Sequence, residues 1–356
     1  MKILIYLTIL NLFFADFLAF KYNLIPRWVT WMPEAASLLI LVYFFYSLSS
    51  KKQLSINTKY IICIFIFIVF IFSGFVLNQV SPGVMFSGLR IYLRYIPFFL
   101  LPIVWNISEK ELKNLLIFIL SLSFMQLPFV LYQRFIEHSG SLSGDPMGGS
   151  LGTYTSGILS VFLLLALAFY IACYLNGKIN FFVFCLGAVI LVLPTSMNET
   201  KITFALLPTC FVLPLVFGVV DKDKIIRIFF LLLFAIIAFI CLKTIYDFFV
   251  VKRWGYGIGE FAQMEGRLQG YADLRLVPIL KTFERMFDDP IFFLFGVGAG
   301  NASVSFSAQM TGEFVNYLNS IGIIRSGITI LIWELGLTGI SIVLLFLFFV
   351  FVDALK

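Results

Sequence analysis

The sequence predicts an all-α, polytopic integral membrane protein: a helical bundle of about ten transmembrane helices with one long extracytoplasmic loop that contains an amphipathic helix. Hydrophobic residues make up 61% of the 356 residues and charged residues 12%, which leaves too few polar side chains to cover a water-soluble domain. The apolar runs are continuous and do not alternate with period two, so helices are expected rather than the strands of a barrel. One long stretch, 247–325, is too polar to cross a bilayer and is the expected loop.

The apolar runs divide the chain into spans in the following order. The first run follows Lys2 without a small-residue cleavage site, so it is interpreted as an uncleaved span rather than a signal peptide. The fourth contains Pro97 and Pro102 and is expected to be kinked or partly re-entrant. Because no internal repeat is found, 1–356 is predicted to be a single polytopic membrane domain with 247–325 as a loop within it. The expected spans are 3–20, 34–50, 60–80, 91–106, 112–133, 157–175, 180–196, 202–220, 225–249 and 326–352.

The cysteines and acidic residues exclude two classes of site. All five cysteines fall inside apolar runs and none has CxxC spacing, so neither a disulfide framework nor a metal-binding knuckle is predicted. Asp288 and Asp289 alone are thin evidence for a divalent cation. We therefore predict no metal and no cofactor, and the net charge of +6 is not taken to indicate a nucleic-acid partner.

The basic residues predict the orientation and hint at a ligand. Lysines and arginines beside the short loops favour cytoplasmic N- and C-termini and an external long loop. In that orientation the inside carries ten lysines and one arginine, whereas the outside carries five lysines and nine arginines. Because the planar guanidinium binds phosphate through two parallel bonds, the external arginines favour an anionic ligand such as a lipid diphosphate. The alternative is that they bind lipid headgroups or pair with nearby acids.

Within the long loop, 275–288 fits an amphipathic helix. Lys281, Glu284, Arg285 and Asp288 share its charged face, which could contribute Arg285 to a site or could simply be solvated. The Asp288-Asp289-Pro290 sequence is a plausible stop for this helix. The residues expected on the apolar face are Leu276, Ile279, Leu280, Phe283, Met286 and Phe287.

A glycine-rich turn, 295–301, follows that helix. Gly296 and Gly298 could let backbone N–H groups point at a phosphate, although the spacing is wrong for a dinucleotide fingerprint.

Charged residues also occur at the outer ends of other expected spans. Glu199 and Lys201 lie in the hairpin between the seventh and eighth spans, where charges are costly and often functional. The alternative is a polar turn whose lysine snorkels to headgroups. Arg90 and Arg94, four residues apart, are expected to project from one helical face towards the same rim.

Three further titratable residues are given structural or incidental roles. Glu334, in the outer third of the last span, is expected to contact Arg325 or another cation. Asp16 is interpreted as a structural polar contact within the bundle. His138, the single histidine, lies in a glycine-containing loop and is interpreted as incidental.

Together these features resemble the O-antigen polymerase and O-antigen ligase superfamily of bacterial envelope glycan assembly. The likeness is carried by the long external loop, the cationic hairpin before it, and the loop helix ending in Asp-Pro followed by Phe-Gly-Val-Gly-Ala-Gly. Trp333-Glu-Leu-Gly-Leu-Thr-Gly339 in the last span and Gly152-Thr-Tyr-Thr-Ser-Gly157 before the sixth span add to it.

The resemblance implies a C-type membrane glycosyltransferase of the bacterial cytoplasmic membrane. Its donor is a polyprenyl-diphosphate-linked oligosaccharide at the outer leaflet, used without a nucleotide sugar or a required metal. The implied partners are this substrate, membrane lipids, a chain-length regulator and a flippase. A transporter or lipid-linked glycan flippase is the alternative from another class, although the chain shows no repeat and its charges concentrate on one face.

Individual residues can be matched to the family pattern. Lys201 matches the hairpin cation, which is usually arginine, and Arg275 or Arg267 matches the arginine at the head of the loop helix. Arg285 and Gly296, with ten residues between them, resemble the arginine–glycine spacing of the polymerases.

The same pattern separates polymerase from ligase and assigns catalytic roles. Ligases are expected to place a histidine in the long loop; this loop has none, which favours a polymerase over a ligase acting on a lipid A-core or other acceptor. The expected catalytic residues are Glu199 as base, with Asp273 and Glu313 as alternatives, and Lys201, Arg275 and Arg285 on the diphosphate. The expected substrate-binding residues are Arg90, Arg94, Arg267, Arg325, Gly296 and Gly298.

Overall fold

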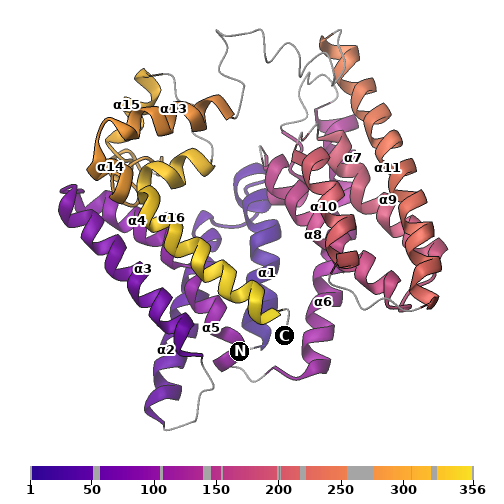
Figure 1. Ribbon diagram of the computed structural model, residues 1–356, viewed down its shortest axis with the longest axis horizontal. Coiled ribbons are helices and arrows are strands. Elements are labelled where there is room, and N and C mark those ends of the chain that lie inside the picture. The colour runs from indigo at the N-terminus through magenta and orange to yellow at the C-terminus, as the bar shows by residue number, and fades with distance from the viewer. Residues whose placement is uncertain are drawn as a thin grey trace. The chain divides into compact units, whose positions relative to one another are not determined.

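The computed structural model describes residues 2–50, 57–104, 107–138, 146–153, 155–198, 200, 202–216, 222–254, 276–305, 307–321 and 327–354. Within these ranges every regular element is a helix, so the predicted all-α fold is confirmed (Figure 1). The chain divides into two compact units. The first comprises Met1–Met32 and Ile107–Met264, and the second comprises Pro33–Asn106 and Glu265–Lys356.

Eight helical segments of the described residues are long and apolar enough to cross a membrane, which makes the chain a multi-pass membrane protein. Two further apolar helices, Phe181–Met197 and Leu206–Leu215, are shorter and coincide with the seventh and eighth expected spans. The remaining two of the ten expected spans therefore stay a prediction. The eight segments are Lys2–Lys21, Arg27–Ser47, Thr58–Leu77, Pro82–Leu101, Glu109–Glu137, Ser156–Leu175, Lys224–Ile245 and Gly327–Ala354.

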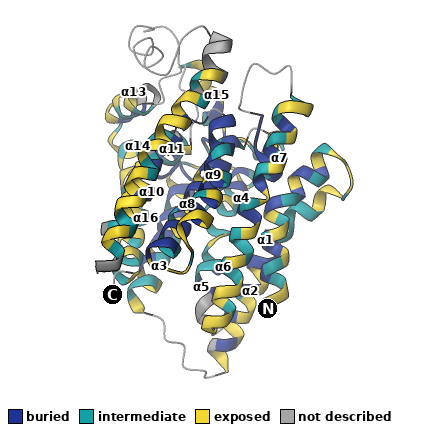
Figure 2. Cartoon of the chain, turned by 90° about the vertical axis from the view of Figure 1, so that its right-hand side faces the viewer, coloured by how far each residue is buried: buried dark blue, intermediate teal, exposed yellow. Residues whose placement is uncertain are grey.

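The first unit is organised around α8 (Ser156–Leu175), the most deeply buried of the eight segments (Figure 2). Its buried residues Leu159, Leu163, Leu167 and Ile171 recur every fourth position and pack against the neighbouring helices. The other helices of this unit are α1 (Lys2–Asp16), η1 (Phe17–Lys21), η2 (Arg27–Trp31), α6 (Glu109–Phe124), α7 (Gln126–Tyr132), η3 (Gln133–Glu137), η4 (Gly149–Leu151), α9 (Phe181–Met197), α10 (Ile202–Val216) and α11 (Lys222–Trp254).

The second unit is organised around α16 (Gly327–Ala354), which packs along α3 (Thr58–Leu77) and against the short helices of the stretch 276–295. Phe70 stacks on Phe295 from that stretch, and Trp333 of α16 donates a hydrogen bond of 3.1 Å to the buried Thr282 hydroxyl. The remaining helices of this unit are α2 (Met32–Ser49), α4 (Pro82–Leu93), α5 (Ile96–Val104), α13 (Leu276–Phe287), α14 (Pro290–Phe295), η5 (Ala308–Met310) and α15 (Phe314–Ser320).

The fourth expected span begins earlier than the sequence suggested. It was expected at 91–106, but helix starts at Pro82, where proline occupies the first turn and needs no hydrogen-bond partner for its nitrogen. The helix then breaks at Arg94 and Tyr95, directly before Pro97, and resumes as α5. The expected kink is thus present, as two helices within one apolar segment.

The glycine-rich turn packs tightly against the helices of its own unit. Gly296 (φ 70°) and Gly336 (φ 57°) adopt left-handed conformations, and a Cβ at Gly336 would lie 2.5 Å from the Gly296 nitrogen. The Val297 N–H donates to the Trp333 carbonyl at 2.7 Å, which joins the turn to α16 just before the kink at Gly336. The turn is therefore part of the packed core of the unit.

Candidate functional site

Arg90 and Arg94 converge on one carboxylate. Their side chains project from α4 and its C-terminal cap to Glu34 in the first turn of α2, with Nε of Arg90 2.7 Å and Nη1 of Arg94 3.2 Å from the same Glu34 oxygen. The expectation that these two arginines share a face is confirmed by this common partner. The Arg94 guanidinium also lies over the Tyr95 ring, 4.5 Å from its centroid, and donates to the Tyr95 hydroxyl.

The cluster of Glu34, Arg90 and Arg94 (the arginine pair, below) brings two cationic groups together. One carboxylate faces two guanidinium groups, and about a quarter to a third of each arginine side chain stays accessible. Oε2 of Glu34 and Nε of Arg94 are buried without a hydrogen-bond partner among the described residues. All three lie in segments apolar enough to cross a membrane, where ionisable side chains are costly and commonly mark a site.

Tyr92, which lies between Arg90 and Arg94 in the sequence, makes a second polar contact. Tyr92 donates a hydrogen bond of 2.7 Å to Oε2 of Glu334, and the Ala302 N–H donates one of 3.1 Å to Oε1. Glu334 is only 1% exposed. The sequence led us to expect a cation beside Glu334, but the donors found among the described residues are neutral, and Arg325 lies outside those residues. Glu334 thus ties the glycine-rich turn and α4 to α16.

The glycines expected to cradle a phosphate are buried against backbone. Gly296 approaches the Glu334 carbonyl, and Gly298 (φ 92°) approaches Val80 and the carbonyl of Gly74 in α3. The turn does present an amide to an anion, at Ala302, but that anion is the Glu334 carboxylate of this chain. Their assignment to substrate stays a prediction, and their close packing gives them a structural role.

Arg285 lies on the exposed face of an amphipathic helix, as expected. In α13 the side chains of Ile279, Phe283 and Met286 pack towards the core, while Lys281, Glu284 and Arg285 are exposed. Two details differ from the expected pattern: Leu280 and Phe287 are 61% and 65% exposed, and Phe287 stacks on Phe293 with ring centroids 4.6 Å apart. Asp289 follows the end of α13 and is the N-cap of α14. Its side chain accepts hydrogen bonds from the N–H groups of Ile291 and Phe292.

The hairpin predicted to hold Glu199 and Lys201 is anchored by its buried neighbours. Asn198 donates to the Ser156 carbonyl at 3.1 Å and accepts from the Thr200 hydroxyl at 2.8 Å. Asn198 and Thr200 are both buried. The bases considered besides Glu199 are Glu313, which is exposed, and Asp273. Five of the expected site residues, and Asp273, lie outside the described residues: Glu199, Lys201, Arg267, Arg275 and Arg325.

Sequence reasoning missed the partners of the expected site residues. Glu34 was not singled out, although it is the first acidic residue of an otherwise apolar segment. Tyr92 was not predicted as a partner of Glu334, because an aromatic residue is common in an apolar span. The position of each acid within an apolar run was the available signal.

Comparison with family models, with curated proteins and with solved structures finds no significant match for this chain.

Proposed function

We propose that this chain is a membrane glycosyltransferase of the O-antigen polymerase type. It transfers a polyprenyl-diphosphate-linked glycan onto a sugar hydroxyl of another lipid-linked repeat at the outer leaflet of the bacterial cytoplasmic membrane. In the reaction the hydroxyl oxygen forms a bond to the anomeric carbon, the bond from that carbon to the diphosphate breaks, and the hydroxyl proton passes to a base.

The arginine pair is the observation that carries this proposal. Arg90 and Arg94 both contact Glu34, so two guanidinium groups gather at one carboxylate, in segments apolar enough to cross a membrane and with both arginine side chains partly accessible. A diphosphate is the anionic group that a lipid substrate brings to such a place, and guanidinium groups bind it through paired hydrogen bonds. Charge grows on the diphosphate as the glycan leaves, and fixed cations stabilise that charge.

Other basic residues extend the same role under this proposal. Arg285, on the exposed face of α13, is available to an anionic ligand at the external side. The residues also assigned to the diphosphate are Lys201, Arg267, Arg275 and Arg325, while Gly296 and Gly298 shape the turn. Glu199 is assigned as the base that takes the proton from the acceptor hydroxyl.

Polymerase is favoured over ligase by the position of the histidine. The stretch 247–325 contains no histidine, and His138 lies instead at the end of η3, with Nε2 3.2 Å from the Glu137 carboxylate in the first unit.

The test uses the purified full-length chain in proteoliposomes with purified lipid-linked repeat units, and the length and yield of polymer are measured. We expect Arg90→Ala and Arg94→Ala each to lower the rate by about 100-fold or more, the usual loss when one donor to a developing charge is removed. Because the remaining arginine still pairs with Glu34, each variant should fold normally. Lys113→Ala, an exposed cation expected on the cytoplasmic side, is the matched control. Normal polymer from both arginine variants would contradict the proposal.

A further inference from the structure

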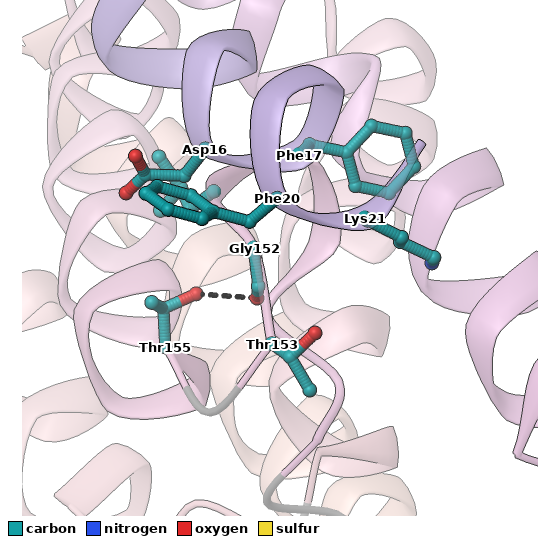
Figure 3. A pocket seen from close by; sticks show the side chains of 8 residues that line it. Asp16, Phe17, Phe20, Lys21, Gly152, Thr153 and Thr155 are labelled. Atoms are coloured by element: carbon teal, nitrogen blue, oxygen red, sulfur yellow. Dashed lines mark hydrogen bonds between the residues drawn. The ribbon is translucent and has the colours of Figure 1, made fainter. Parts of the chain in front are cut away.

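A cavity of about 340 Å³ opens in the first unit, beside the end of the first span (Figure 3). Its volume is at the lower end of the roughly 300–1,000 Å³ range of small-molecule sites, enough for a compact ligand. The residues that matter for its chemistry are Asp16, Phe17, Phe20, Lys21, Thr153 and Thr155.

Irregular backbone shapes both walls of this cavity. One wall is the π-helix η1, which carries Phe17, Phe20 and Lys21; single π-helical turns in helices are frequent at functional sites. The opposite wall contains Gly152, whose φ of 107° lies in the left-handed region, and Thr155, whose hydroxyl donates to the Gly152 carbonyl at 2.8 Å. The π-helical turn, the conformation of Gly152 and the Thr155 hydrogen bond therefore fix the shape of the two walls.

The cavity lining carries one carboxylate, Asp16, and one ammonium, Lys21, and the Arg27 guanidinium lies 5.5 Å from the centroid of the Phe20 ring. Asp16 is exposed, and no hydrogen bond or ion pair of its side chain is found among the described residues. Lys21 is instead tied to Glu137 of the π-helix η3, and its ammonium lies 4.6 Å from the centroid of the Phe17 ring. In Figure 3 the Asp16 carboxylate and the Phe20 ring lie on one side of Gly152 and Lys21 on the other. The sequence-based interpretation of Asp16 as a structural contact is therefore not what the structure shows.

We propose that this cavity binds a sugar unit of the lipid-linked glycan. A carboxylate accepts hydrogen bonds from sugar hydroxyls, and the Thr153 and Thr155 oxygens can accept others. The electron-rich face of the exposed Phe20 ring attracts the C–H bonds of a sugar ring. The Asp16 carboxylate repels a diphosphate, and the Lys21 ammonium is paired with Glu137.

The cavity and the predicted catalytic hairpin meet the same end of α8. Thr155 lines the cavity at the N-cap of α8, and the next residue, Ser156, accepts the hydrogen bond of Asn198. The hairpin that contains Glu199 in sequence is thus anchored one residue from the cavity wall. This inference rests on the proposed function in naming the glycan, and it assigns Asp16 as a substrate-binding residue rather than a base.

The test identifies the occupant of the cavity directly. Phe20→p-benzoylphenylalanine places a photoreactive ring in the wall; the full-length protein is irradiated in membranes that contain its lipid-linked substrate, and the adduct is identified by mass spectrometry. We expect an adduct that releases sugars on acid hydrolysis. Phe182→p-benzoylphenylalanine, at a phenylalanine that is 77% exposed on α9, is the control and should yield no sugar.

A second variant tests the role of the carboxylate. Asp16→Asn keeps the shape of the side chain but removes its charge, so we expect glycan adducts at position 20 to fall and KM for the lipid-linked repeat to rise about tenfold, with kcat changed less than about twofold. Sugar-free adducts at position 20, or an unchanged KM for Asp16→Asn, would overturn the inference. If either of these results is obtained while the wild-type chain still forms polymer, the inference about the cavity fails and the proposed function stands. If glycan adducts form but no polymer is made, the cavity stands and the polymerase proposal fails.

Discussion

Glu334 is a buried carboxylate of α16 that accepts hydrogen bonds on both of its oxygens. Tyr92 donates to one oxygen and the Ala302 N–H to the other, and Ser303 and Gly300 also lie within hydrogen-bonding reach. We expect Tyr92→Phe to lower the free energy of unfolding by about 1–3 kcal/mol, because it removes a hydrogen bond to a buried carboxylate. The measurement is thermal unfolding of the purified protein in detergent, with Tyr46→Phe, at an exposed tyrosine of α2, as the control.

The same pair can be tested for coupling. Glu334→Gln puts an amide where a carboxylate accepted two bonds, so its cost should be similar. Because both substitutions disrupt one shared hydrogen bond, the double variant should lose less than the sum of the two losses. Strictly additive losses would show that Tyr92 and Glu334 act independently.

Glu199 and Lys201 are expected to have separate roles in the reaction. Two residues apart, they would not face each other on a helix, but a turn can direct both into one site. We expect Lys201→Arg to keep substantial polymer yield, since it preserves the charge, and Lys201→Ala to lose it. Glu199→Gln keeps the shape but removes the base, so polymer should be lost while the thermal stability in detergent changes little. A fully active Glu199→Gln variant would leave this residue with a structural role.

Some residues of the site could be predicted from local spacing and others could not. The positions of Arg90 and Arg94, four apart in an apolar run, predict a shared face, and the common contact to Glu34 confirms it. Glu34 itself lies 56 residues before Arg90, and nothing local in the sequence indicates that pairing. Tyr92 and Glu334 are 242 residues apart and are equally unpredictable from spacing.

At the scale of elements, the kink in α16 depends on Gly336. Its φ of 57° is costly for any residue with a Cβ, and an added Cβ would lie 2.7 Å from the Leu294 carbonyl oxygen and 2.5 Å from the Gly296 nitrogen. Because both atoms belong to backbone, they cannot move aside cheaply. We expect Gly336→Ala to lower the yield of folded protein and its melting temperature.

Gly327 is the matched control for that substitution. It lies in the same helix, and a Cβ there would meet nothing within 4 Å. Gly327→Ala should be neutral or slightly stabilising, because alanine has the better helix propensity. Equal stability of the two alanine variants, measured by size-exclusion profile and thermal unfolding, would mean that α16 can straighten at no cost.

Helical elements were predicted well where their pattern is local. The amphipathic helix expected at 275–288 is observed as α13, because the 3.6-residue periodicity of its apolar residues is strong. Its rotation is less well predicted: Thr282 is buried through its bond to Trp333, while Leu280 is exposed. The start of α4 was missed because Pro82 was not taken as the first turn of a helix.

At the scale of the whole molecule, ion pairs and hydrogen bonds join the helix ends that the predicted topology places together. In the first unit Lys2 pairs with Glu111 at two expected cytoplasmic ends, and Lys21 pairs with Glu137 at two expected external ends. In the second unit Asp353, near the end of α16, pairs with Lys59 at the start of α3. Each unit is therefore internally consistent with alternating spans.

The same ion pairs would form whichever side of the membrane the termini face, so the orientation of the chain is tested separately. We expect cytoplasmic termini and an external α13. The measurement uses a background without native cysteines and a membrane-impermeant maleimide applied to intact cells. Lys281→Cys, at an exposed position on α13, should be labelled; Lys178→Cys, exposed in the turn between α8 and α9, should be labelled only after permeabilisation.

The result decides more than the placement of two loops, because lysine and arginine are distributed differently on the two expected sides. With α13 outside, nine of the ten arginines face the side where a lipid-linked glycan would be polymerised. The opposite labelling pattern would place those arginines, including Arg90 and Arg94, at the cytoplasmic surface. The arginine bias would then be explained by the attraction of basic residues to anionic lipids there, and the assignment of the arginine pair to an external diphosphate would fail.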